Sequence, residues 1–228
     1  AFRSTLPFST AALSAPTEEL AEVAPEPATV PAAVPTAADP RQKHVVQYLS
    51  RRYRVAEGAT RMLVSTAFQI GHENKLDPLL ILSVVAIESS LNPFAESSMG
   101  AQGLMQVMTR VHAERFEPHG GQLAALDPVA NMKVGSAILS DLISRGGSVE
   151  RGLQLYVGAG NLPDDGGYGA RVLSERSRMA LAASGKVDAA ISAGRPTVAS
   201  EQKPATADAT PMAQPQTRPT VDSPLPVE

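Results

Sequence analysis

Apolar positions between residues 41 and 183 follow helical spacing, and no segment shows strand alternation with hairpin turns between. Residues three or four apart share a face of a helix, and so do residues two such steps apart. Leu49 and Tyr53 therefore lie on one face of the first expected helix, and Met62 and Ile70 lie on one face of the second. Glycine or proline separates each such segment from the following one. We therefore expect six or seven helices packed into an all-α domain. The expected ranges are 41–55, 59–74, 78–88, 109–116, 128–146, 149–157 and 168–183.

The most apolar of these segments ends on an acid. Asp77 is a favourable N-cap and Pro78 suits the first helical position, so the start of this helix is well defined. From Leu79 to Ile87 the only polar residue is Ser83, and the next residue is Glu88. A carboxyl group at the end of a helix that is apolar all round is partly desolvated, which raises its pKa. Glu88 is therefore a candidate general acid.

Proline divides the chain into a domain and two tails. Fourteen of the 19 prolines lie in residues 1–40 or 195–228, in segments too rich in Ala, Pro, Glu and Thr to bury a core. We expect residues 1–40 and 191–228 to be disordered and residues 41–190 to form the single folded domain.

Charge and composition exclude several classes of function. Residues 41–185 carry 15 Lys or Arg against 13 Asp or Glu, which is far from the dense basic stripe of a nucleic-acid-binding protein. The chain has no cysteine, so it forms no disulfide and no thiolate metal site. It contains no apolar run long enough to cross a membrane. It begins with Ala instead of Met, as a processed or trimmed form does.

Four short motifs occur in a fixed order along the domain. Glu-Ser at Glu88 is followed by Asn92-Pro93 and by Ala-x-Ser-x-x-Gly-Ala-x-Gly-Leu-Met-Gln over residues 95–106. Further on come Asp-Pro-x-x-Asn-x-x-x-Gly over residues 127–135, a glycine-containing turn of Tyr156 with Gly158 and Gly160, and Tyr-x-x-x-Val from residue 168. Over roughly residues 44–175 the sequence resembles the soluble-type (SLT) lytic transglycosylases, relatives of goose-type lysozyme. The resemblance implies a lysozyme-like helical domain.

The resemblance also implies a reaction. Lytic transglycosylases cleave the β-1,4 bond between N-acetylmuramic acid and N-acetylglucosamine in peptidoglycan and leave a 1,6-anhydromuramoyl end. Glu88 would act first as the acid that protonates the leaving oxygen and then as the base that activates the C6 hydroxyl, with no metal or cofactor. The expected partners are peptidoglycan strands, in the periplasm or another extracytoplasmic part of the bacterial envelope.

Six further positions are expected to contact the substrate, and each has a structural alternative. Short polar loops can hydrogen-bond sugars, although the same residues can serve only to hold the loop together, and tyrosines at helical spacing often fill a core. Asn is usual after the motif tyrosine, where this chain has Val157, so its contact is either lost or taken over by Asn161. Thr109 stands where the family has proline. The candidate substrate-binding residues are Ser97, Gln106, Met108, Tyr156, Asn161 and Tyr168.

Two other functions stay open at this level. One is a peptidoglycan-binding or scaffold module that has kept the fold without activity, for which Val157 is the only hint. The other is a muramidase that adds water. The proline-rich tails could also connect the domain to a secretion, pilus or flagellar assembly.

Overall fold

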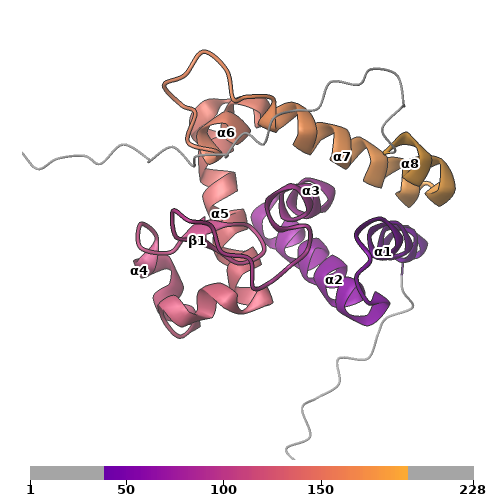
Figure 1. Ribbon diagram of the computed structural model, residues 1–228, viewed down its shortest axis with the longest axis horizontal. Helices are drawn as coiled ribbons and strands as arrows, with labels where there is room; N and C mark the ends of the chain where they lie inside the picture. The colour runs from indigo at the N-terminus through magenta and orange to yellow at the C-terminus, as the bar shows by residue number, and fades with distance from the viewer. Residues whose placement is uncertain (1–38, 195–228) are drawn as a thin grey trace, which may run out of the picture. The chain divides into compact units, whose positions relative to one another are not determined.

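The computed structural model describes residues 39–194, and the mostly helical fold expected from the sequence is confirmed (Figure 1). Apart from positions 39–40 and 191–194, the predicted disordered tails lie outside the described residues. The α-helices are α1 (Pro40–Tyr53), α2 (Glu57–Asn74), α3 (Pro78–Ser89), α4 (Ala113–Phe116), α5 (Pro128–Gly146), α6 (Val149–Tyr156), α7 (Tyr168–Ala183) and α8 (Val187–Ala193). The other elements are the strands β1 (Ala101–Gln102) and β2 (Val107–Met108) and the 3-10 segments η1 (Glu117–His119) and η2 (Gln122–Leu126).

Aspartate followed by proline starts three of the helices. The carboxylate of Asp77 accepts a hydrogen bond from the Leu79 N–H at 2.9 Å, and that of Asp127 accepts one from the Ala130 N–H at 2.7 Å. Asp39 caps α1 in the same way. Each proline then occupies a helical position at which its missing N–H leaves no bond unmade. The starts predicted at residues 78 and 128 are thereby confirmed.

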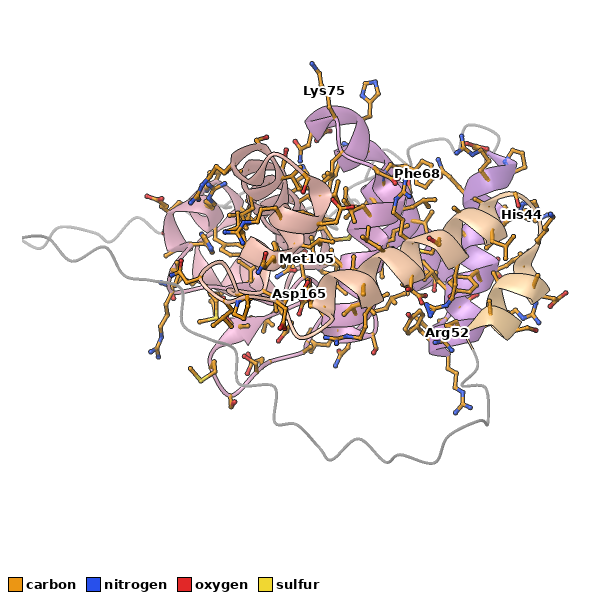
Figure 2. The ribbon with its side chains drawn as sticks, turned by 90° about the horizontal axis from the view of Figure 1, so that it is seen from above. His44, Arg52, Phe68, Lys75, Met105 and Asp165 are labelled. Atoms are coloured by element: carbon orange, nitrogen blue, oxygen red, sulfur yellow. The ribbon has the colours of Figure 1, made fainter. Side chains whose placement is uncertain are left out.

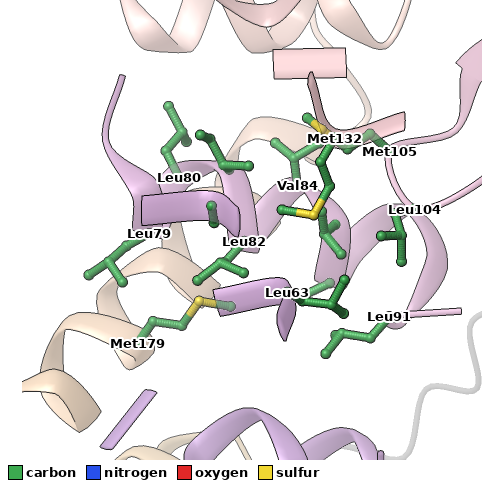
Figure 3. Packing of buried hydrophobic residues seen from close by; sticks show 14 of the residues in the cluster. Leu63, Leu79, Leu80, Leu82, Val84, Leu91, Leu104, Met105, Met132 and Met179 are labelled. Atoms are coloured by element: carbon green, nitrogen blue, oxygen red, sulfur yellow. The ribbon is translucent and has the colours of Figure 1, made fainter. Parts of the chain in front are cut away.

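Helix α3 runs through the middle of the core. Every residue from Leu79 to Ala86 is buried, and the helix packs against α2 on one side and α7 on another. Figure 3 shows its leucines and Val84 surrounded by Met132 and Met105 on one side and Met179 on another. A helix without a polar face is stable only when it is enclosed in this way. Glu88 follows two residues after Ala86, so the burial of this helix places Glu88 at the edge of the core.

A small hairpin in the middle of the domain was not predicted. Strands β1 and β2 pair antiparallel, with Ala101 opposite Met108 and Gln102 opposite Val107. Each strand has two residues, which is too short to show alternation in a sequence.

Two helices also differ from the prediction. The helix expected from residue 109 begins at Ala113, because the buried hydroxyl of Thr109 donates a hydrogen bond to the side chain of Gln102 at 2.6 Å and keeps this segment beside the hairpin. Residues 168–183 are not the last helix, since α8 follows and packs against α1 and α7. Its buried face consists of little more than Val187 and Ala190, so its apolar pattern is weak.

Candidate active site

The carboxyl group of Glu88 lies where the end of α3 meets the start of α7. It is half-buried, and its Oε1 accepts a hydrogen bond of 2.6 Å from the phenol hydroxyl of Tyr168. Tyr168 itself is buried, with 3% of its surface exposed. The two residues are 80 positions apart in the sequence, and the packing of α3 against α7 brings them together.

Burial raises the pKa of Glu88 to about 7. The hydrogen bond from Tyr168 and the positive charge of Arg171 act in the opposite direction, but more weakly. The predicted direction is therefore confirmed, with desolvation as its main cause. Within residues 39–194, no second carboxylate is among the groups that shift this pKa. Near neutral pH, Glu88 exchanges readily between the acid and the carboxylate.

Tyr156 is a second tyrosine close to Glu88. Its hydroxyl donates a hydrogen bond to the main-chain oxygen of Met105 at 2.8 Å, which ties the end of α6 to the turn between β1 and β2. Burial raises the pKa of both Tyr156 and Tyr168 well above their usual range, and the negative charge of Glu88 adds to this effect. Both phenols therefore remain protonated donors near neutral pH.

The loop before α7 sets the position of Tyr168. Asp165, labelled in Figure 2, accepts hydrogen bonds from the N–H groups of Gly167 at 2.9 Å and Gly169 at 2.7 Å. A Cβ atom on Gly169 would lie 2.8 Å from the Asp165 carboxylate, so a side chain at this position would displace that carboxylate from its hydrogen bonds. Asp165 thus fixes the first turn of α7 and, with it, the phenol that reaches Glu88. It has no place in the quoted motifs, so the sequence did not single it out.

Asn131 of α5 holds the hairpin turn in place. This residue is fully buried; its amide oxygen accepts from the Met105 N–H at 2.8 Å. Its amide nitrogen donates to the oxygens of Gln102 at 2.9 Å and Ala125 at 2.8 Å. Gly103 packs so closely against it, with φ of +77°, that a Cβ atom would lie 2.3 Å from the Asn131 amide nitrogen. The Asn of the Asp-Pro-x-x-Asn motif therefore positions the hairpin through its side-chain hydrogen bonds.

Gln106 and Ser97, two of the predicted sugar-contacting residues, are partly engaged within their own loop. The amide nitrogen of Gln106 donates to the oxygens of Ala95 at 2.9 Å and Gly103 at 3.0 Å. The hydroxyl oxygen of Ser97 accepts from the Ala101 N–H at 3.0 Å. In this arrangement Gln106 keeps its carbonyl oxygen as an acceptor, and Ser97 keeps its hydroxyl proton as a donor.

Met108 and Asn161 lie in different surroundings. Met108 is half-buried in β2, opposite Ala101. Asn161 is exposed and lines an open cavity of about 740 Å³ beside α5, whose lining includes neither Glu88 nor Tyr168. Val157, which stands in the usual asparagine position, caps α6 and packs against the core. Among the six candidates, only Tyr168 is hydrogen-bonded to Glu88 in the structure.

The part of the chain that the structure describes contains no cluster of three or more His, Cys, Asp or Glu that could hold a metal ion. Among the same residues, no helix has both the length and the apolar character required to span a membrane.

Comparison with known proteins agrees with the geometry. The transglycosylase SLT domain family matches residues 47–162, a segment that includes Glu88, the hairpin, Asn131 and Tyr156. An 86-residue stretch is 40% identical to a protein of Enterobacteria phage PRD1 named transglycosylase. That match covers 38% of this chain and 31% of the phage protein, so the chain spans about a third of the length of this relative. Because the family match extends over half of the 228 residues, the protein is a member of the transglycosylase SLT domain family.

Proposed function

We propose that the protein is a peptidoglycan lytic transglycosylase that cleaves the bond between N-acetylmuramic acid and N-acetylglucosamine and forms 1,6-anhydromuramoyl products. Membership of the SLT family supports the substrate class. The observation that carries the reaction type is the environment of Glu88, a carboxyl group with a pKa of about 7 and no second carboxylate among the groups that shift it within residues 39–194. The same proposal assigns the protein to an extracytoplasmic compartment, where peptidoglycan lies.

Glu88 would transfer protons in two steps. As the acid, it gives its proton to the glycosidic oxygen while the bond from the anomeric carbon to that oxygen breaks. As the carboxylate, stabilised by the Tyr168 hydroxyl and the charge of Arg171, it takes the proton of the C6 hydroxyl as that oxygen bonds to the anomeric carbon. The enzyme regains its proton and the sugar gains an internal ring. A pKa near the working pH suits a group that performs both steps.

Attack by the sugar's own hydroxyl explains why one carboxylate is enough. Hydrolytic glycosidases use a second carboxylate, either as a nucleophile or to activate water. An oxygen already attached to the reacting sugar has a very high effective concentration, so it needs less activation than an external water.

The remaining candidates would position the sugar chain. The carbonyl oxygen of Gln106 can accept from an acetamido N–H, the hydroxyl of Ser97 can donate to a sugar oxygen, and Met108 offers a half-buried apolar surface. Tyr156 would act as a positioning residue by holding the oxygen of Met105. Tyr168 would touch the reacting acid itself.

Removal of the Tyr168 hydroxyl is expected to shift the pH profile in a defined direction. The proposed reaction begins with protonated Glu88, so kcat/KM should fall as the pH rises through about 7, the pKa of Glu88. The hydroxyl lowers this pKa by donating to the carboxylate. In Tyr168→Phe the pKa therefore rises and the alkaline limb of the profile moves to higher pH. The measurement is kcat/KM against pH on soluble glycan strands.

Tyr156→Phe is the matched control, because it removes a phenol hydroxyl that bonds to Met105 and not to Glu88. This variant should keep the alkaline limb of the wild type even if its rate is lower. A limb that stays in place or moves to lower pH in Tyr168→Phe would contradict the role given to this hydrogen bond.

An assay for the solubilisation of peptidoglycan sacculi distinguishes an enzyme from a module that only binds them. Purified protein should clear a suspension of sacculi and release soluble muropeptides. A wild-type protein that sediments with sacculi but releases no more material than Glu88→Gln would favour the binding or scaffold function instead.

A further inference from the structure

A buried carboxylate on α7 is not used by the proposed reaction. Glu175 has 1% of its surface exposed, and both of its carboxylate oxygens accept hydrogen bonds. Its Oε1 accepts from the phenol hydroxyl of Tyr48 on α1 at 2.7 Å, and its Oε2 accepts from the guanidinium group of Arg178 at 2.7 Å. Tyr48 is fully buried as well. The bond from Tyr48 therefore joins α1 to α7, across 127 positions of the sequence.

The charged and titratable groups around Glu175 come from α1 and α7. Burial raises the pKa of Tyr48 and of Tyr53 well above their usual range, and the negative charge of Glu175 adds to this effect. The positive charges of Arg52 and Arg178 lower the pKa of Tyr53, but to a smaller extent. Both phenols therefore stay protonated near neutral pH, and Tyr48 remains a donor to the carboxylate.

Glu175 and Tyr168 lie on the same face of α7. They are seven residues apart, which is almost two turns of an α-helix and about 10 Å along its axis. Val172 and Met179 share this face, and all four side chains are buried. Helix α7 packs against both α1 and α3 (Figure 1). One helix therefore carries the carboxylate that is tied to α1 and the phenol that bonds to Glu88 at the end of α3.

The polar contact of Glu175 restricts α7 more than its apolar contacts do. Methionine adapts to different neighbours, so packing such as that of Met179 holds a helix loosely. A shift that separates Glu175 from the Tyr48 hydroxyl instead leaves a buried charge and a buried donor unpaired. Arg176 also joins α7 to α3 by an ion pair with Asp77, but both side chains are partly exposed, so this pair contributes less.

We propose that Glu175 is a positioning residue for the reaction: its hydrogen bond from Tyr48 holds α7 where the Tyr168 hydroxyl reaches the carboxyl group of Glu88. The inference rests on the proposed function, because it takes Glu88 as the reacting acid. The bond between Tyr168 and Glu88 measures 2.6 Å. Hydrogen bonds between two oxygens extend to only about 3.0 Å, so a shift of α7 by about 1 Å breaks it.

The pKa of Glu88, measured by NMR, tests this proposal without any turnover. Protein labelled with carbon-13 at the glutamate carboxyl groups is titrated, and the Glu88 signal is the one missing in Glu88→Gln. The Tyr168 hydroxyl lowers this pKa, so Tyr168→Phe should raise it. Tyr48→Phe removes only the hydroxyl that donates to Glu175. It should raise the Glu88 pKa by about half or more of the change in Tyr168→Phe.

A double variant distinguishes positioning from a general loss of stability. In Tyr48→Phe/Tyr168→Phe the Glu88 pKa should equal that of Tyr168→Phe alone, because Tyr48 acts only through the bond that Tyr168 makes. Thr60→Val is the matched control. It removes a buried hydroxyl that donates to the Ala56 oxygen at 3.1 Å, within α2 and its N-cap, and it should leave the Glu88 pKa unchanged.

Two substitutions of Glu175 itself distinguish position from charge. Glu175→Ala removes both the acceptor and a negative charge. Loss of a negative charge alone lowers the pKa of other carboxyl groups, whereas loss of the anchor raises the Glu88 pKa through Tyr168, so the sign of the change identifies the cause. Glu175→Gln keeps an oxygen that accepts from Tyr48 and should restore most of the wild-type value. If Glu175→Ala does not fold, the milder Tyr48→Phe decides the question.

An unchanged or lowered Glu88 pKa in Tyr48→Phe, or a further rise in the double variant, would overturn the proposal. The proposed function fails by a different readout. If the wild-type protein forms no anhydro ends but the Glu88 pKa depends on Tyr48 through Tyr168, the positioning role stands and the reaction is wrong. If anhydro ends form and Tyr48→Phe leaves the pKa unchanged, the reaction stands and the positioning role is wrong.

Discussion

Glu88→Gln is expected to lower the rate of glycan cleavage by about 1000-fold or more, within the range that loss of a general acid and base covers. Glutamine has nearly the same shape and can still accept the hydrogen bond from Tyr168. It has no proton to give to the leaving oxygen and cannot take one from the C6 hydroxyl. The measurement is the release of soluble muropeptides from sacculi over time by purified protein.

Glu73→Gln provides the control for this change. Glu73 is an exposed acid of α2 whose side chain accepts a hydrogen bond from Gln69, and its replacement should leave the rate within about twofold of the wild type. Retention of a tenth or more of the wild-type rate in Glu88→Gln would show that another group performs the proton transfers.

Glu88→Gln should also stabilise the fold at alkaline pH. The pKa of Glu88 is raised from 4.5 to about 7 by folding. A carboxyl group whose pKa is higher in the folded protein than in the unfolded chain stabilises the fold. This contribution is fully present at a pH below the pKa in the unfolded chain, and it is lost as the pH rises through the pKa in the folded protein. The cost of the buried charge is about 3 kcal/mol above neutral pH. Glu88→Gln should therefore unfold at a higher temperature than the wild type at about pH 8, with a smaller difference at about pH 4.

Asn131→Asp is expected to destabilise the protein by about 2–4 kcal/mol. The side chain is fully buried, and the amide nitrogen donates to two main-chain oxygens, those of Gln102 and Ala125. An aspartate of the same shape places a carboxylate oxygen against both of these acceptors and leaves them without a donor. The hairpin turn and the oxygen of Met105, to which Tyr156 bonds, should then move, so activity should fall as well.

Urea unfolding of the two proteins measures this difference. Gln122→Glu is the matched control, because it also exchanges an amide for an acid but at an exposed position, and it should change the free energy of unfolding by less than about 0.5 kcal/mol. A loss below about 1 kcal/mol in Asn131→Asp would mean that the three hydrogen bonds of Asn131 do not hold the hairpin.

Local signals in the sequence predicted the features that depend on local chemistry. The Asp-Pro starts at residues 77 and 127 act through hydrogen bonds spanning two or three residues, so the helix positions follow from the chain itself. The raised pKa of Glu88 also follows from its place at the end of an apolar helix. The hairpin and α8 escaped prediction because two-residue strands and an Ala-rich helix have too few apolar positions to give a pattern.

Contacts between distant residues needed the structure. Nothing in the periodicity of α7 indicates that the Tyr168 hydroxyl reaches Glu88, 80 positions away. Asp165 was not identified because its role is to cap the backbone of a turn. The open cavity beside α5 combines residues from α4, α5 and α6 and the turn after α6, which are separated in the sequence and share no motif.

The isotopic composition of the reaction product tests the central claim most directly. Sacculi digested by the wild-type protein in water labelled with a heavy oxygen isotope are analysed by mass spectrometry. If Glu88 directs attack by the C6 hydroxyl, the new muramic acid ends are anhydro forms, one water lighter than reducing ends, and contain no heavy oxygen. Reducing ends that carry heavy oxygen at the anomeric carbon would instead show that water attacks, and that the protein is a muramidase with a second catalytic group still to be identified.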